Sequence, residues 1–176
     1  MKMGKILSLK TEIFGINIFL IKVWGVGKNM SELQIIKKKD RMLAIIIRNN
    51  YKCEGVDFIT PHEYSQQLAY MHHPEGKIID AHVHNLVHRN VVLTQEVLFL
   101  KKGKLRVDFY DDYKDYLESH ILEAGDTILL TSGGHGFKVL EEVEMIEVKQ
   151  GPYSGERDKI RFEGISDEEV FMKVEE

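Results

Sequence analysis

The sequence predicts an all-β protein built as an antiparallel barrel or jelly roll. From Leu33 onward, short apolar runs are separated by turn residues at intervals of about eight to twelve positions, as is typical of such folds. Between Lys104 and Tyr110, polar and apolar side chains alternate, which is the period-two pattern of a half-buried strand. No long amphipathic helical pattern competes with this reading. The 176 residues, 43% of them hydrophobic, suffice for the core of one domain.

The first half of the chain contains four candidate strands. The continuous branched run from Leu43 to Ile47 is typical of a strand buried on both faces, and Gly55 to Ile59 is a weaker candidate. Two more, Gln67 to Met71 and Lys77 to Leu86, flank the segment His73-Pro74-Glu75-Gly76. Its proline and glycine suit a tight turn, so we expect a β-hairpin here.

The second half predicts further strands separated by glycine-containing turns or a polar loop. In order, the strands are Val91 to Leu100, Leu105 to Tyr110, Tyr116 to Leu122, Thr127 to Leu130, Phe137 to Leu140 and Glu144 to Lys149. The first two are separated by the turn Lys101-Lys102-Gly103. After Gln150 the chain is expected to fold back on the barrel, with a short final segment at Glu169 to Val174.

Residues 1–29 are expected to form an N-terminal arm or to come from a wrongly assigned start codon. Residues 30–176 are expected to form a single barrel domain with a C-terminal extension. Residues 1–29 contain an apolar stretch from Ile13 to Gly27, which Asn17 and Lys22 interrupt. This stretch is shorter than the roughly 20 residues that cross a bilayer, and no signal-peptidase site follows it. We therefore expect a cytoplasmic protein that does not bind a membrane.

Composition excludes several classes of function. The chain carries 24 basic and 28 acidic residues, for a net charge of -4 and a pI near 6.1, so it lacks the basic excess of a nucleic-acid-binding protein. Its single cysteine, Cys53, rules out an internal disulfide and any zinc site built on several thiolates. Any metal ion would have to be held by histidine and carboxylate side chains.

The histidines are the main clue to function, because five of the eight lie within 17 residues. His82 and His84 are one residue apart, so on a strand both imidazoles point to the same face, with Cα atoms about 7 Å apart. Glu96 lies on the next predicted strand, and His135 lies in a glycine-rich turn further along the chain. Three histidines and one carboxylate suit a divalent transition metal: iron, manganese, nickel or zinc.

At these residues the sequence resembles the cupin superfamily, whose double-stranded β-helix is a small jelly-roll barrel. Gly76, His82-Val83-His84, Glu96 and Gly103 resemble the first cupin motif, and Gly125 with Thr131-Ser132-Gly133-Gly134-His135 resembles the second. The resemblance spans roughly residues 66 to 150. It implies that His82, His84, Glu96 and His135 are the metal ligands.

Departures from the cupin pattern leave the identity of the fourth ligand open. Eleven residues separate His84 from Glu96, where the family usually has three or four, so Gln95 or His88 could take the place of Glu96. Thr131 replaces the proline of the second motif, which shifts the turn but keeps a histidine at its end.

The histidines outside the motifs have other expected roles. His72 and His73 are expected to be turn residues, and His120 to lie at the surface. Arg89, in the long segment between the two groups of ligands, could line the barrel mouth and bind an anionic substrate group.

The sequence therefore predicts a metal-binding cupin that acts on or binds a small polar molecule inside the barrel, such as a sugar derivative or a carboxylate. As an enzyme it would be a metal-dependent isomerase, epimerase or dioxygenase. The alternatives are a noncatalytic ligand-binding or sensor cupin and a metal-free structural jelly roll. Cupins often pair through an edge sheet, so the resemblance also implies a homodimer as one candidate assembly.

Overall fold

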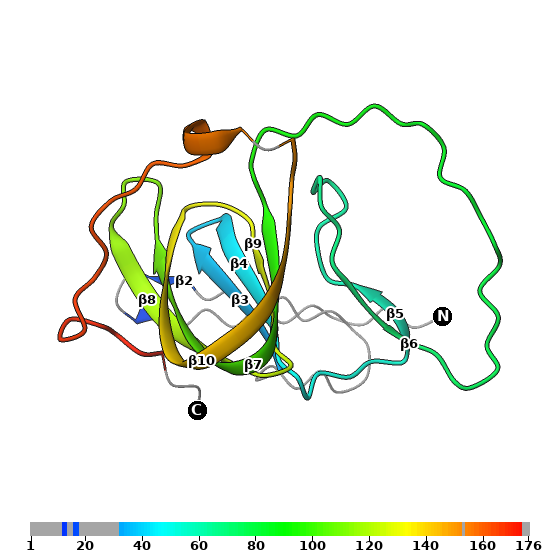
Figure 1. The fold of residues 1–176 in the computed structure, drawn as a ribbon, viewed down its shortest axis with the longest axis horizontal. Coiled ribbons are helices and arrows are strands. Elements are labelled where there is room, and N and C mark those ends of the chain that lie inside the picture. The colour runs from blue at the N-terminus through cyan, green and yellow to red at the C-terminus, as the bar shows by residue number, and fades with distance from the viewer. Residues whose placement is uncertain (1–11, 14–15, 18–31, 153, 174–176) are drawn as a thin grey trace.

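The protein is all-β in a computed structural model that describes residues 12–13, 16–17, 32–152 and 154–173 (Figure 1). The strands are β1 (Glu12–Ile13), β2 (Ile16–Asn17), β3 (Leu33–Lys38), β4 (Arg41–Ile47), β5 (Gly55–Phe58), β6 (Ala69–His72), β7 (Glu96–Tyr110), β8 (Tyr116–Glu123), β9 (Thr127–Leu130) and β10 (Gly134–Lys149). One short 3-10 helix, η1 (Gly155–Asp158), follows β10. Within the described ranges, no helix is long and apolar enough to cross a membrane. The predicted N-terminal arm, residues 1–29, lies outside the described residues except for β1 and β2.

The main sheet has six strands and curls into a half-barrel (Figure 1). Its order is β10-β7-β9-β4-β3, and β8 pairs with the second half of β7, beyond the residues that pair with β9. All of these pairings are antiparallel. In the described part of the chain, β10 pairs with no strand other than β7, so one edge of this 16-residue strand is free.

A bend at Gly103 explains why β7 can serve both halves of the sheet. The sequence predicts a turn at this point, but the chain continues as one strand of 15 residues. Gly103 adopts φ +85°, and a Cβ atom added there would lie 2.0 Å from the carbonyl oxygen of Glu142. Only glycine fits such a close approach of two backbones. The two strands predicted between Phe137 and Lys149 likewise merge into β10, whose register shifts opposite this bend.

The core lies on the concave face of the half-barrel. Before the bend β7 contributes Leu98 and Leu100, and after it Leu105, Val107 and Phe109, all at most 5% exposed. The buried residues have even numbers before the bend and odd numbers after it. Since side chains alternate between the two faces of a regular strand, the bend must shift this alternation by one residue and so keep the apolar side chains on one face. Branched side chains of β4 and β9 complete this core, as the buried run of Leu43 to Ile47 predicts.

One predicted strand is wrong. Lys77 to Leu86 forms no strand, and β6 pairs antiparallel with β5, the preceding strand, instead of with the segment that follows it. Residues 77–93 form an exposed arm that extends away from the sheet, as Figure 1 shows in green. We refer to this segment as the arm.

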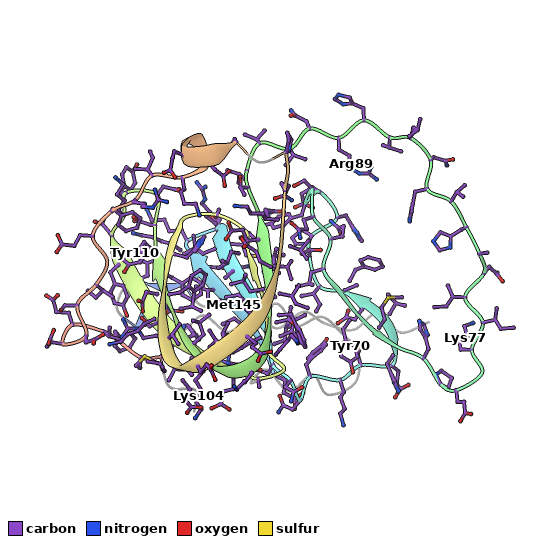
Figure 2. All side chains as sticks on the ribbon, in the orientation of Figure 1. Tyr70, Lys77, Arg89, Lys104, Tyr110 and Met145 are labelled. Atoms are coloured by element: carbon purple, nitrogen blue, oxygen red, sulfur yellow. The ribbon has the colours of Figure 1, made fainter. Side chains whose placement is uncertain are left out.

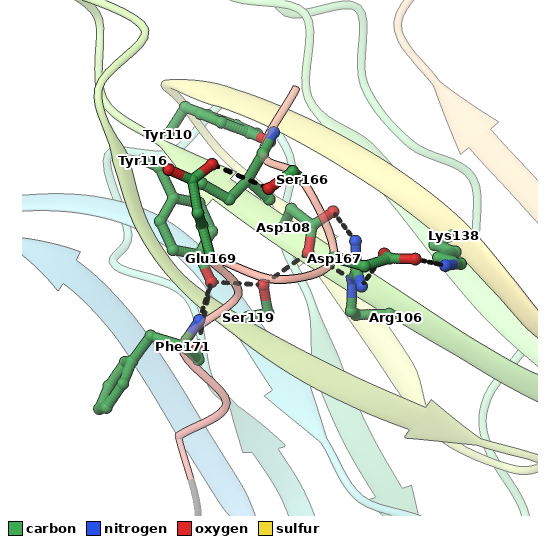
Figure 3. Close-up of polar contacts among 11 residues, drawn as sticks. Arg106, Asp108, Tyr110, Tyr116, Ser119, Lys138, Ser166, Asp167, Glu169 and Phe171 are labelled. Carbon is green, nitrogen blue, oxygen red and sulfur yellow. Dashed lines mark hydrogen bonds and ion pairs between the residues drawn. The ribbon is translucent and has the colours of Figure 1, made fainter. Parts of the chain in front are cut away.

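The C-terminal segment 160–173 crosses the outer face of β7 and β8 (Figure 3). The Phe162 ring packs edge-on against the Tyr110 ring at 5.0 Å between centroids. Asp167 pairs with Arg106 of β7 at 2.9 Å and also with Lys138 of β10. The sequence predicts a short final segment at Glu169 to Val174. In the described part of this segment, Met172 forms an isolated parallel β-bridge with Ser119 of β8. The segment after Gln150 therefore folds back onto the half-barrel sheet, as the sequence predicts.

Candidate functional site

Two of the four predicted metal ligands meet on the concave face. Antiparallel pairing places His135 opposite Phe109 and Lys149 opposite Glu96, and directly opposed residues share one face of a sheet. The curl of the β7–β10 ladder brings the first residues of both strands together. His135 Nε2 lies 3.3 Å from Glu96 Oε2, with side-chain exposures of 29% and 12%.

Lys149 and Asp158 extend this pair into a row of four charged or titratable groups. Lys149 Nζ lies 3.7 Å from Glu96 Oε1 and 3.0 Å from Asp158 Oδ2. Asp158 belongs to η1 and also accepts a hydrogen bond from Thr94 Oγ1 at 3.3 Å. The row therefore joins the start of β7, both ends of β10 and the segment that follows β10.

The electrostatics favour an ionised Glu96. Its contact with His135 lowers the pKa of the carboxyl below its ordinary value, and the nearby charge of Lys149 acts in the same direction. Burial opposes this shift but is outweighed. The hydrogen bond to Asp158 in turn raises the pKa of Lys149. An anionic carboxylate beside an imidazole is the form in which the two groups could bind a metal ion.

The other predicted ligands, His82 and His84, lie on the arm and away from Glu96 and His135. Their rings are neighbours, 5.3 Å apart between centroids and nearly perpendicular, and His82 Nδ1 contacts the Asp80 carbonyl at 2.9 Å. Both side chains are exposed. Across the residues that the structure describes, no group of three histidine, cysteine or acidic side chains is close enough to hold a metal ion. The structure thus divides the four predicted ligands into two pairs.

No protein-family model matches the chain, and no curated protein or solved structure matches it either.

The remaining candidates lie in different surroundings. Arg89 is exposed on the arm, where its Nη1 donates to the Val87 carbonyl at 3.4 Å (Figure 2). His88, one alternative to Glu96, is also exposed on the arm. Gln95, the other alternative, is only 5% exposed, and its backbone N–H donates to the side chain of Gln150.

The expected positions of His72 and His120 are wrong, and His72 is the last residue of β6 rather than a turn residue. His120 is 4% exposed rather than at the surface; its Nε2 lies 3.0 Å from Glu118 Oε1, and its ring packs against Phe109. Because Val107 and His120 are opposed in the β7–β8 ladder, His120 faces the core. Charged neighbours in the sequence do not reveal this orientation.

Sequence reasoning also missed Lys149 and Asp158. Lys149 is the last residue of a predicted strand. The period-two alternation of a strand would have placed its side chain on the same face as that of Met145. Which residue lies opposite it depends on the β7–β10 register, which local patterns do not contain.

Proposed function

We propose that the protein is a metal-binding barrel of the cupin type, in which His82, His84, Glu96 and His135 together hold one divalent transition metal ion. The observation that carries this proposal is the contact of Glu96 with His135 at 3.3 Å. Two motifs that are far apart in the sequence each predict one of these residues as a ligand. Iron, manganese, nickel and zinc all accept such a set of nitrogen and oxygen donors.

The proposal requires the arm to close onto the half-barrel. Residues 77–86 would pair with the free edge of β10 and complete a double-stranded β-helix, which would bring His82 and His84 towards Glu96 and His135. The chain from His84 to Glu96 is long enough, because its twelve steps span up to about 40 Å when extended.

Exposed apolar groups on both partners support this closure. Ile78, Val83 and Leu86 of the arm are 78%, 90% and 104% exposed, and Val139 and Ile146 of β10 are 55% and 52% exposed. A long free strand edge with apolar side chains is normally covered in a folded protein. Pairing would remove water from both surfaces and satisfy the backbone groups of β10 that face away from β7.

The bound ion would supply Lewis acidity toward a substrate oxygen or, as iron, the capacity to activate dioxygen. Glu96 would contribute a negative charge, and Lys149 would add to the effect of His135 in keeping that carboxylate ionised. The ligand would be a small polar molecule, a sugar derivative or a carboxylate, bound on the concave face. Arg89 would move with the arm and could contact an anionic group of that ligand. The proposed classes are a metal-dependent isomerase, epimerase or dioxygenase and, as the alternative, a noncatalytic sensor.

Metal titration of the untagged protein tests the proposal. We expect calorimetry and elemental analysis to give one zinc or manganese ion per chain. His82→Ala, His84→Ala and His135→Ala should each abolish stoichiometric binding, and Glu96→Gln should weaken it by about tenfold or more, since an amide lacks the charge of the carboxylate. His72→Ala is the matched control, because His72 contacts Glu54 on the β5–β6 hairpin and is not a proposed ligand.

Two other outcomes are informative. Full occupancy in Glu96→Gln, together with loss in Gln95→Ala or His88→Ala, would assign the fourth ligand to one of those residues. Unchanged binding in all three histidine variants, or no stoichiometric binding by the unaltered protein, would overturn the proposed site and favour a metal-free jelly roll.

A further inference from the structure

The second feature that could bind a ligand is a pocket of about 440 Å³ at the rim of the sheet. Four separate segments line it: the β3–β4 turn, the loop between β5 and β6, the end of the arm with the residue before β7, and the residues after β9. None of the four proposed metal ligands lines it. Its volume is within the range of small-molecule sites.

The walls of the pocket are held by hydrogen bonds between these segments. The Ser132 hydroxyl donates to the Met42 carbonyl at 2.6 Å and accepts from Arg41 Nε at 3.0 Å. The Thr131 hydroxyl donates to the same carbonyl at 2.7 Å. On the opposite wall the Ser65 hydroxyl donates to Gln95 Oε1 at 3.4 Å. These bonds join the β3–β4 turn to the residues after β9, and the β5–β6 loop to the residue before β7.

Several polar groups of the pocket remain available to a ligand. The Gln95 side-chain nitrogen, the Tyr64 hydroxyl and the Asn90 amide have no hydrogen-bond partner among the described residues. Together they offer both donors and acceptors. Apolar side chains, Met42, Val92 and Leu93, form the rest of the lining. Hydroxyls and amides beside an apolar strip match a ligand that alternates hydroxyl groups with C–H surface.

The charge of the pocket argues against an anionic ligand. Arg41 is the only basic side chain of the lining in the described structure, and it already pairs with Asp112 and Ser132. The carboxylates of Asp40 and Glu63 line the same pocket. An anion would meet two negative charges and one cation that is already paired.

We propose that this rim pocket binds a neutral saccharide unit. The carboxylates accept hydrogen bonds from sugar hydroxyls, the amides and hydroxyls both donate and accept them, and Met42, Val92 and Leu93 contact the C–H face of the ring. This inference goes beyond the proposed metal site, because the pocket needs neither the metal nor a closed arm between residues 77 and 86.

Ligand-observed NMR on the protein in EDTA tests the inference. The probes are the methyl glycosides of glucose, galactose and mannose, with glucosamine as a cationic probe and inorganic phosphate as an anionic one. We expect saturation transfer to at least one methyl glycoside, with a dissociation constant on the order of 1 mM, and none to phosphate. Backbone amide shifts should change at residues 63–65 and 131–132.

Variants that remove single polar groups provide the matched comparison. Tyr64→Phe, which deletes one hydroxyl, should weaken glycoside binding about fivefold, whereas Tyr113→Phe should leave it unchanged. Tyr113 is 86% exposed and does not line the pocket. Asn90→Ala should likewise weaken binding, and Asn85→Ala, at an arm position outside the pocket, should not.

Binding of glucosamine or phosphate in place of the neutral glycosides would overturn the assignment of ligand class. Absence of binding by every glycoside, or equal effects of Tyr64→Phe and Tyr113→Phe, would overturn the site itself. Because EDTA is present throughout, these results do not depend on metal binding, and failure of the metal site leaves them unaffected.

Discussion

Arg106 illustrates at the scale of a single residue how the C-terminal segment is attached. Its side chain is nearly buried on the outer face of β7, where Asp108 contacts Nε at 2.8 Å and Asp167 contacts Nη1 at 2.9 Å (Figure 3). Asp108 also accepts a hydrogen bond from Ser119 at 2.5 Å. A buried guanidinium needs such partners, since an unpaired buried charge is strongly destabilising. Asp167 therefore links the C-terminal segment to the sheet through charge.

This link predicts a specific pH dependence. The ion pairs with Lys138 and then Arg106 hold the pKa of Asp167 below its ordinary value. A lowered pKa in the folded state means that the carboxylate contributes stability above the unfolded pKa of about 4, and that this contribution is lost as the pH falls through the folded value. The difference in unfolding free energy between the unaltered protein and Asp167→Asn should be largest near neutral pH and should decrease under acid conditions.

Urea unfolding at a series of pH values measures this gap. In a Lys138→Met background the gap should be smaller at neutral pH, because the largest cause of the shift is gone. A gap of the same size at pH 3 and pH 7 would show that Asp167 acts through shape rather than charge.

At the scale of elements, the bend in β7 determines how the half-barrel forms. Gly103→Ala places a methyl group 2.0 Å from the Glu142 carbonyl oxygen and forces alanine into φ +85°. We expect a loss of more than about 3 kcal/mol of unfolding free energy, since the strain of the backbone adds to the collision between β7 and β10.

Gly155→Ala is the matched control for this prediction. Gly155 also has a positive φ, +68°, but a Cβ atom there meets nothing within 4 Å. Its substitution should cost only about 1 kcal/mol, from the backbone conformation alone. Equal losses in the two variants, measured by urea unfolding, would show that the close approach at Gly103 is not what demands glycine.

Most strands could be predicted from the sequence because local patterns determine them. The run from Leu43 to Ile47 and the run from Thr127 to Leu130 appear as β4 and β9. The Lys77–Leu86 segment shows the limit of this approach. Its alternation is compatible with a strand, but a strand also needs a neighbour, and no described strand pairs with this segment, since β6 pairs with β5 instead. Pairing depends on segments distant in the sequence, which single-residue patterns do not report.

The candidate site was predictable to a similar extent. Motif spacing selects Glu96 and His135, and the structure brings them together. Motif spacing could not select Lys149, because the contact of Lys149 with Glu96 depends on the register of β7 against β10. Burial of His120 likewise follows from its position opposite Val107 rather than from its charged neighbours.

At the scale of the whole molecule, the proposed function brings together the edge of β10 and the arm. Among the described residues, one edge of β10 has no partner strand. The arm carries His82 and His84 and, near them in the sequence, exposed apolar side chains. Closure of the arm onto that edge would complete the barrel and the metal site in one step. Metal binding and barrel closure should therefore be coupled, since the ion would bind tightly only to the closed form, in which all four proposed ligands meet.

Amide hydrogen exchange of β10, with and without zinc, tests this coupling most directly. About every second N–H of an edge strand faces away from its partner and exchanges rapidly unless another strand covers it. The account predicts that zinc slows exchange at these outward N–H groups between residues 134 and 149, and that His82→Ala and His84→Ala abolish the slowing. Stoichiometric zinc binding that leaves these N–H groups unprotected would contradict closure of the arm onto β10.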